Sequence, residues 1–176
     1  MSTIKTNAIQ TTAGKPILNS TGSILQVVQG LKTDAFTVNA NTGIVQIAGL
    51  TASITPTSTS SKILISVSIS HTVAQGATTY GAVVRRNGNV DVQVGDAAGS
   101  RQRFNVPLTW AGDNNQHNAY AWSVLDSPAT TSSTTYSIWV NNDNSQLLYV
   151  NRTSNDADNL TGKRTISTIT LFEISA

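Results

Sequence analysis

Cysteine is absent from this chain of 176 residues. Without cysteine the protein has no disulfide framework, no thiolate ligand for zinc and no thiol nucleophile. The same absence leaves the redox compartment open. The stability of the protein must therefore come from packing or from assembly with other chains.

Charged residues are also scarce, at 11% of the sequence against about 25% in ordinary soluble domains. The net charge is +2, and the basic residues form no stripe of the kind that nucleic-acid-binding domains carry. No segment approaches the roughly 20 apolar residues of a membrane span, and the start of the chain lacks the apolar core of a signal peptide. We expect no nucleic-acid partner, no membrane insertion and no secretion by signal peptide.

Glutamate, a strong helix former, occurs once, at Glu173, whereas Ser, Thr, Asn and Gln are abundant. This composition favours strands over helices. The clearest strand is residues 62–73, KILISVSISHTV, in which apolar side chains occupy odd positions and hydroxyl groups occupy most even ones. Because strand side chains alternate between faces, the pattern predicts a strand with one buried face.

Short runs of the same kind recur along the chain between turn residues. Their number, roughly ten, predicts an all-β protein, an antiparallel β-sandwich of the jelly-roll type. Gly30 is expected to separate the first two strands, and Gly49 to mark a bulge. The predicted strands other than 62–73 are 23–29, 36–38, 44–54, the two arms of a hairpin at 81–86 and 89–94, 102–110, 120–124, 136–140, 147–151 and 165–174.

Three of these runs carry more specific signals. Asn87-Gly88 predicts a two-residue type I′ turn, which would pair Arg86 with Asn89. Pro107 cannot donate a ladder hydrogen bond, so residues 102–110 are expected at a sheet edge. Residues 165–174 are apolar on both faces, which indicates a central strand or one whose second face meets a neighbouring subunit.

Candidate catalytic and metal-binding residues are few. His71 and His117 are far apart without metal-ligand spacing, and the serines lie in no GxSxG motif. Asp156 and Asp158 could offer oxygen ligands to a hard cation, but the segment lacks the glycine and distal glutamate of an EF-hand, and a plain Asx-rich turn is the favoured interpretation. We expect no catalytic residue, no cofactor, no metal and no enzymatic activity.

Trp139 is the aromatic residue that is expected to face outward, because Tyr136, Ile138 and Val140 form the inward set of its strand. An outward indole ring suits contact with a glycan or with another subunit.

Residues 1–22 lack the strand pattern of the rest of the chain. Their apolar residues are isolated among Thr, Asn and Gln, and Pro16 interrupts any regular element. Composition alone fits a disordered tail as well as an extended arm that docks on another surface. The docking residues of such an arm would be Ile4, Ile9, Ile17 and Leu18.

The opening STIKTNAIQTTAGKPILNSTGSILQVVQ resembles that of a family of small tail-fibre-like virion structural proteins of tailed phages from aquatic bacteria. The stretches SITPTSTSSKILISVS, VGDAAGSR, SVLDSPATTSSTTYSIWV and TISTITLFEISA are similar to the rest of that family. The resemblance implies a particle component located in the virion. It does not indicate whether the protein belongs to a fibre, a tail or the capsid.

Together these observations predict a docking arm over residues 1–22 and a β-sandwich domain over residues 23–176. The expected function is that of a non-enzymatic phage virion protein attached through Ile4, Ile9, Ile17 and Leu18, with other virion proteins as partners. A homotrimer is expected, because the resemblance points to fibre-type proteins and assembly would cover the second apolar face of the last strand. The alternatives are a module at a fibre tip that binds a receptor or a host surface glycan, and a capsid decoration protein.

Overall fold

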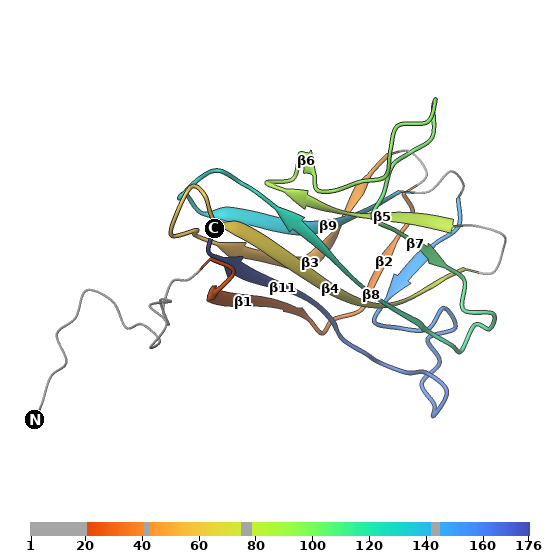
Figure 1. Cartoon of the computed structure of the whole chain (residues 1–176). Coiled ribbons are helices and arrows are strands. Elements are labelled where there is room, and N and C mark those ends of the chain that lie inside the picture. Colours follow the sequence, from red (N-terminus) through yellow and green to blue (C-terminus); the bar gives the residue numbers. More distant parts are fainter. Residues whose placement is uncertain (1–20, 41–42, 75–78, 142–144) are drawn as a thin grey trace, which may run out of the picture.

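The computed structural model describes residues 21–40, 43–74, 79–141 and 145–176. Every regular element in these ranges is a strand (Figure 1). None of the described residues belongs to a helix with the length and apolarity to cross a lipid bilayer. The strands are β1 (Ile24–Lys32), β2 (Phe36–Val38), β3 (Val45–Ile54), β4 (Lys62–Val73), β5 (Thr79–Arg86), β6 (Val90–Asp91), β7 (Val106–Thr109), β8 (Asn118–Asp126), β9 (Thr134–Asn141), β10 (Leu148–Val150) and β11 (Ser167–Ile174).

Strand β4 coincides with the predicted strand 62–73 and is paired along both edges. One edge pairs with β8, and the other pairs with β11 and then with β10. Its odd-numbered side chains are buried as expected, from Ile63 at the start to Val73 at the end. The period-two pattern therefore predicted both the strand and its orientation.

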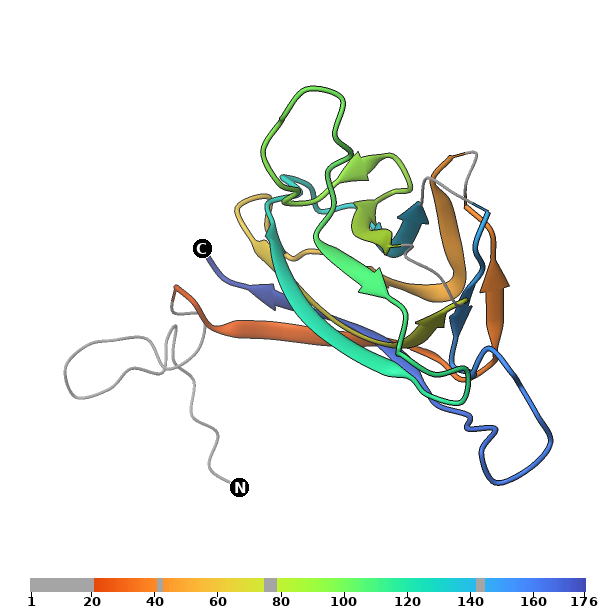
Figure 2. The same ribbon diagram turned by 90° about the vertical axis from the view of Figure 1, so that its right-hand side faces the viewer.

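The strands form four antiparallel pairs that are nested along the chain: β1 with β11, β3 with β9, β4 with β8, and β5 with β7. The first and third pairs make a sheet in the order β1-β11-β4-β8, and the other two make a sheet in the order β3-β9-β5-β7. Short strands extend this frame, with β10 beside β4, β2 beside β10, and β6 beside β5. This is the strand order of a jelly roll, and Figure 2 shows its two layers from the end. The predicted fold class is confirmed.

The core fills the space between the two layers. Two tyrosines lie within it and are fully buried, each with its hydroxyl group satisfied. Tyr80 donates to the carbonyl oxygens of Val38 and Gln146, and Tyr136 donates to Asp126. The largest aliphatic side chains around them are Ile47, Leu50, Ile54, Ile63, Ile65, Ile69, Leu108, Ile138, Leu148 and Ile169.

The prediction that Gly30 separates two strands is wrong, because β1 continues through Gly30 to Lys32. Gly30 is opposite Ile169 of β11, and a Cβ there would lie 2.0 Å from the carbonyl oxygen of Thr51. The glycine thus permits a close backbone approach between β1 and β3. The bulge predicted at Gly49 is present, with a positive φ of 80° and a register shift between Gln46 and Thr51.

The hairpin at Asn87-Gly88 is present, but its register differs by one residue from the prediction. Both turn residues have positive φ, 50° and 77°, as the type I′ geometry requires. Arg86 nevertheless pairs with Val90 rather than with Asn89, so the loop has three residues. Because of the extra residue, Val92 lies opposite Val84 rather than Val83, and the N–H of Val92 donates to the carbonyl oxygen of Val84. Strand β6 ends after two residues.

The predicted edge strand and the last strand are both found, within shorter bounds. Strand β7, which contains Pro107, pairs with β5 alone among the described strands and so lies at an edge. Strand β11 is central, between β1 and β4. Its Glu173 is fully buried, and its two carboxylate oxygens accept hydrogen bonds from Gln26 at 2.5 Å and from the N–H and hydroxyl of Thr57 at 2.7 Å.

We predict that Gly88→Ala lowers the free energy of unfolding by about 1 kcal/mol, because an alanine is strained at positive φ. A Cβ there would meet its nearest neighbour, Cζ2 of Trp139, at an ordinary 3.6 Å, so the cost arises from the backbone. The measurement is the denaturant midpoint at an unchanged m-value. Gly95→Ala is the matched control, since Gly95 has no positive φ and nothing within 4 Å of an added Cβ; equal midpoints for both variants would contradict the turn geometry.

Candidate interaction surfaces

The outer face of the sheet β1-β11-β4-β8 carries a row of four apolar side chains, one from each strand. Val27 is opposite Phe172, Phe172 is opposite Leu64, and Leu64 is opposite Leu125. Residues that are directly opposite in antiparallel strands point to the same face of the sheet. The four side chains therefore form a continuous line across the sheet, on the side away from the core.

Exposure along this face is greatest at β1. Ile24, Val27 and Leu31 are 60%, 55% and 54% exposed. Beyond the row and these β1 residues, most side chains of the face are small or bear a hydroxyl group. They include Ser66, Ser68, Ala121, Ser123, Thr168 and Thr170. The apolar row and the exposed residues of β1 are the part of this face suited to bind another apolar surface.

The face is also poor in charge. Lys62 lies at its end, next to Leu64, whereas the two carboxylates of the same strands point inward. Glu173 is buried beneath the sheet, and Asp126 accepts hydrogen bonds from Arg86 and Tyr136 at 2.8 Å each. Among the described residues of these four strands, no carboxylate is left on the outer face.

A groove of about 470 Å³ lies at the end of this face where the described chain begins. Gly22 has a φ of 85°, and its N–H donates to the carbonyl oxygen of Ser175 at 2.8 Å, so the entering chain is fixed beside the end of β11. The attachment residues that the sequence predicts, Ile4, Ile9, Ile17 and Leu18, lie outside the described residues. The groove is lined by Thr21, Gly22, Lys62, Leu125, Ile174, Ser175 and Ala176.

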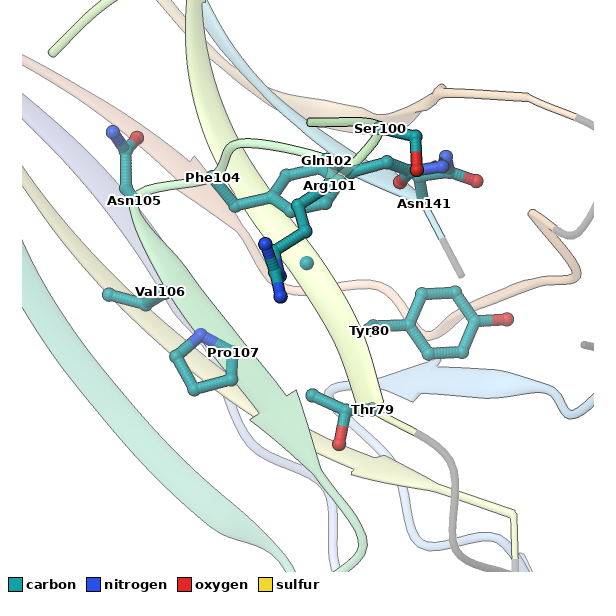
Figure 3. A pocket seen from close by; sticks show the side chains of 11 residues that line it. Thr79, Tyr80, Ser100, Arg101, Gln102, Phe104, Asn105, Val106, Pro107 and Asn141 are labelled. Atoms are coloured by element: carbon teal, nitrogen blue, oxygen red, sulfur yellow. Dashed lines mark hydrogen bonds between the residues drawn. The ribbon is translucent and has the colours of Figure 1, made fainter. Parts of the chain in front are cut away.

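The outer face of the opposite sheet carries a cavity of about 560 Å³, between β5 and the segment that leads into β7 (Figure 3). Phe104 lies across β5 where Gly81 leaves room for its ring, since a Cβ at Gly81 would meet that ring at 2.0 Å. Arg101 is the charged side chain of the lining, whose other polar groups are amides and hydroxyl groups. A polar ligand could contact these groups and the apolar side chains beside them.

The amide groups of the cavity differ in their availability. Asn105 is fully used, because it accepts from the N–H of Val84 and donates to the carbonyl oxygens of Val92 and Gln93. Asn141 is 9% exposed and donates to Gln102 at 2.7 Å. Its buried Oδ1 accepts no hydrogen bond from a described residue. Because this oxygen is itself buried, an ordered water molecule is the partner best suited to satisfy it.

Trp139 lies on the same outer face as this cavity, two residues before Asn141 on β9, as its sequence parity predicted. It is half-buried rather than free. The guanidinium group of Arg85 lies 5.1 Å from the ring centroid, and the indole N–H donates to the hydroxyl of Ser137 at 2.9 Å. A stacking ligand or a neighbouring subunit would meet this arginine along with the ring.

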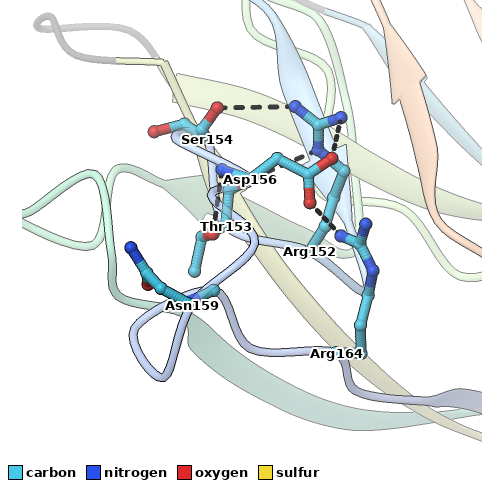
Figure 4. Close-up of polar contacts among 7 residues, drawn as sticks. Arg152, Thr153, Ser154, Asp156, Asn159 and Arg164 are labelled. Atoms are coloured by element: carbon cyan, nitrogen blue, oxygen red, sulfur yellow. Dashed lines mark hydrogen bonds and ion pairs between the residues drawn. The ribbon is translucent and has the colours of Figure 1, made fainter.

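The loop between β10 and β11 holds Asp156 and Asp158, the residues with oxygen ligands that a hard cation could use (Figure 4). Asp156 pairs with Arg152 at 2.9 Å and with Arg164. The hydrogen bond from Arg164 holds the pKa of Asp156 below its usual value. The described residues contain no group of three side chains suited to hold a metal ion. With two guanidinium groups already on its carboxylate, Asp156 serves as the polar anchor of this loop.

His71 and His117, which are far apart in the sequence, lie near enough in the structure for the charge of one to affect the other. His71 is fully buried and stacks on Tyr120, with ring centroids 5.3 Å apart. The backbone of Thr109 lies near the ring, but neither ring nitrogen makes a hydrogen bond of normal geometry to a described residue. Burial is the main cause that lowers the pKa of His71 to about 4, and the nearby His117 acts in the same direction.

Comparison with known proteins gives little. The chain matches no protein family and no curated protein sequence. Among solved structures, it is similar to a chain in a structure of infectious bursal disease virus, Gx strain, with a TM-score of 0.40 and 14% sequence identity. The similarity covers 86% of this chain and 36% of that one, so the protein spans about a third of the solved chain. The resemblance to tail-fibre-like phage proteins stays a prediction.

We predict that the protein loses about 3 kcal/mol of stability between pH 6.5 and pH 4 through His71. The unfolded chain binds a proton at His71 near pH 6.5, whereas the folded chain binds it only near pH 4. Its contribution is thus fully present above pH 6.5 and is lost as the pH falls. Glu173 adds a loss only below pH 4.5, because hydrogen bonds overcome the effect of burial and lower its pKa to about 2.

Urea unfolding at a series of pH values measures this slope. His71→Gln should flatten it between pH 6.5 and pH 4, whatever the absolute stability of the variant. His117→Gln is the control and should leave most of the slope in place, since burial also lowers the pKa of His117 but the ring is only partly buried. A slope that is unchanged in His71→Gln would contradict the assignment.

Proposed function

We propose that this protein is a non-enzymatic structural protein of a virus particle, a tail-fibre-like component held by residues 1–22 with the β-sandwich projecting outward. One observation carries the proposal. The outer face of β1-β11-β4-β8 presents an exposed apolar row without a carboxylate, on a fold that is already closed by its own core.

This apolar row does not belong to the core of the domain. The core lies on the other side of the same strands, and the row is therefore surplus to the folding of one chain. Depletion of charge and contiguous apolar side chains are properties of surfaces that bind other proteins. A structural role in an assembly gives this face a partner, and we place the subunit interface at its most exposed part, Ile24, Val27 and Leu31 of β1.

Fold and sequence support the same role by analogy. Jelly rolls occur in viral capsid and lectin domains, although a fold alone does not define a function. The sequence resemblance to small tail-fibre-like virion proteins adds the setting and covers most of the chain. Placement on a fibre is our leading proposal, and a capsid decoration protein of the same fold is the alternative.

A second candidate, a glycan-binding module at a fibre tip, is favoured by the opposite face. The cavity there is lined by amides, by hydroxyl groups and by the ring of Phe104, and Trp139 lies close by on β9. Hydroxyl groups and the apolar face of a sugar suit such a lining. The two roles are compatible, because the cavity and the apolar row lie on opposite sheets.

We predict that a chain beginning at Ser23 keeps its β-type circular dichroism and a cooperative melt but fails to incorporate into particles. The removed residues include four large apolar side chains, and burial of each is worth roughly 1.5 to 3 kcal/mol. That total exceeds the ordering cost of a modest docking interaction. Incorporation is measured by the protein content of purified particles.

The matched variant for this test is the full-length chain with Ile4→Asn and Ile9→Asn, which keeps the length of the segment and should show the same defect. Normal incorporation of the truncated chain would refute attachment by residues 1–22. Loss of the fold would show instead that these residues are an integral part of the sandwich.

We predict a homotrimer in solution at micromolar concentration, because the exposed apolar residues of β1 need cover from another subunit and closed symmetry satisfies every copy equally. Val27→Asn with Leu31→Asn should lower the mass toward that of the monomer. Light scattering of the unaltered protein at 18.5 kDa, the mass of one chain, would contradict the prediction.

A further inference from the structure

The groove beside Leu125 and Ile174 lies where residues 1–20 join the described chain. Two of its lining residues, Thr21 and Gly22, are the first that the structure describes. The hydrogen bond from Gly22 to Ser175 holds this junction at the end of the apolar face. Any segment that continues from Gly22 therefore starts at the mouth of an apolar groove.

We infer that Ile17 and Leu18 of the same chain occupy this groove and extend onto Leu64 and Phe172. The four Cα-to-Cα steps from Leu18 to Gly22 span at most about 14 Å when extended. The sheet itself, four strands at about 4.8 Å spacing, is roughly 15 Å wide. The pair is thus tethered within reach of the half-buried end of the row. It is also the densest apolar part of residues 1–20.

The short covalent link from Leu18 to Gly22, the tether, favours this occupant over a second copy of the chain. A short flexible linker gives an effective concentration of the order of millimolar. Copies of the protein at micromolar concentration would compete at a disadvantage of about a thousandfold for the same groove. Ile17 and Leu18 are themselves uncharged, and the charged residues among residues 1–20 are Lys5 and Lys15.

Docking of Ile17 and Leu18 would set the direction in which the remaining segment leaves the sandwich. Ile4 is 18 residues from Gly22, a reach of at most about 60 Å, which is twice the roughly 30 Å length of the nine-residue strand β1. Ile4 and Ile9 would then be free to bind another protein of the particle. This last step rests on the proposed function, whereas the occupation of the groove does not.

The absence of cysteine allows a direct test by disulfide trapping in the full chain. Leu125→Cys is combined with either Ile17→Cys or Leu18→Cys, and the protein is oxidised as a mixture of tagged and untagged copies. We expect at least one pair to form a disulfide within one chain. The control combines Leu18→Cys with Ala119→Cys, on the same face of β8 but about 20 Å along the strand, and should give at least about tenfold less product, since the tether does not reach it.

Bonds that join tagged to untagged copies would overturn the inference in favour of a second copy as the occupant. Equal yields for Leu125→Cys and Ala119→Cys would overturn it in favour of a segment that does not dock. Neither outcome bears on particle incorporation, so the proposed function fails or stands by its own experiment.

A denaturant series gives an independent measurement without crosslinks. Leu18→Asn and Leu125→Asn should each lower the unfolding midpoint, and the double variant should lose no more than the larger single loss, because both remove one contact. Ile4→Asn is the control and should leave the midpoint unchanged. An unchanged midpoint in Leu18→Asn, or fully additive losses, would overturn the inference.

Discussion

The fold depends on β4, a strand that is hydrogen-bonded along both edges and, from Lys62 to Ile69, buried on one face only. This double pairing places β11 on one side and β8 on the other, and β11 in turn pairs with β1. The buried face must be apolar because it meets the other layer. The outer face does not have to be apolar for the chain to fold, so apolar side chains there indicate a role outside the core.

Along that outer face, hydroxyl groups and alanines lie mostly toward one end of the strands, with Leu31 among them. The apolar row and the groove lie toward the other end, with Lys62 beside them. The carboxylates of these strands are turned inward and satisfied, Glu173 by Gln26 and Thr57, and Asp126 by Arg86. Because no carboxylate of these strands lies on the outer face and each one is paired inside, another protein surface could cover this face without burying an unpaired negative charge.

The two outer faces thus differ in a way that suits a particle component. One is apolar and lies beside the entry of residues 1–20, and the other carries a cavity with amide groups, Arg101 and Phe104. A protein attached through residues 1–22, which join the sandwich beside the first face, would present the second face to the surroundings. The two candidate roles, attachment and ligand contact, thus fall on opposite sides of one sandwich and use different residues.

Sequence alone determined what depends on local periodicity and turn chemistry: the strand at 62–73, the bulge at Gly49, the turn at Asn87-Gly88, the edge position of Pro107 and the all-β class. It misplaced the hairpin register by one residue and read Gly30 as a break, because loop length and the approach of Thr51 are set by the packing of distant strands. The jelly-roll type was inferred from strand number, but which strands pair was not. The apolar row and the meeting of His71 with His117 were decided only by tertiary structure, since each joins residues far apart in the chain whose side chains share a face only once the register of several strands is fixed.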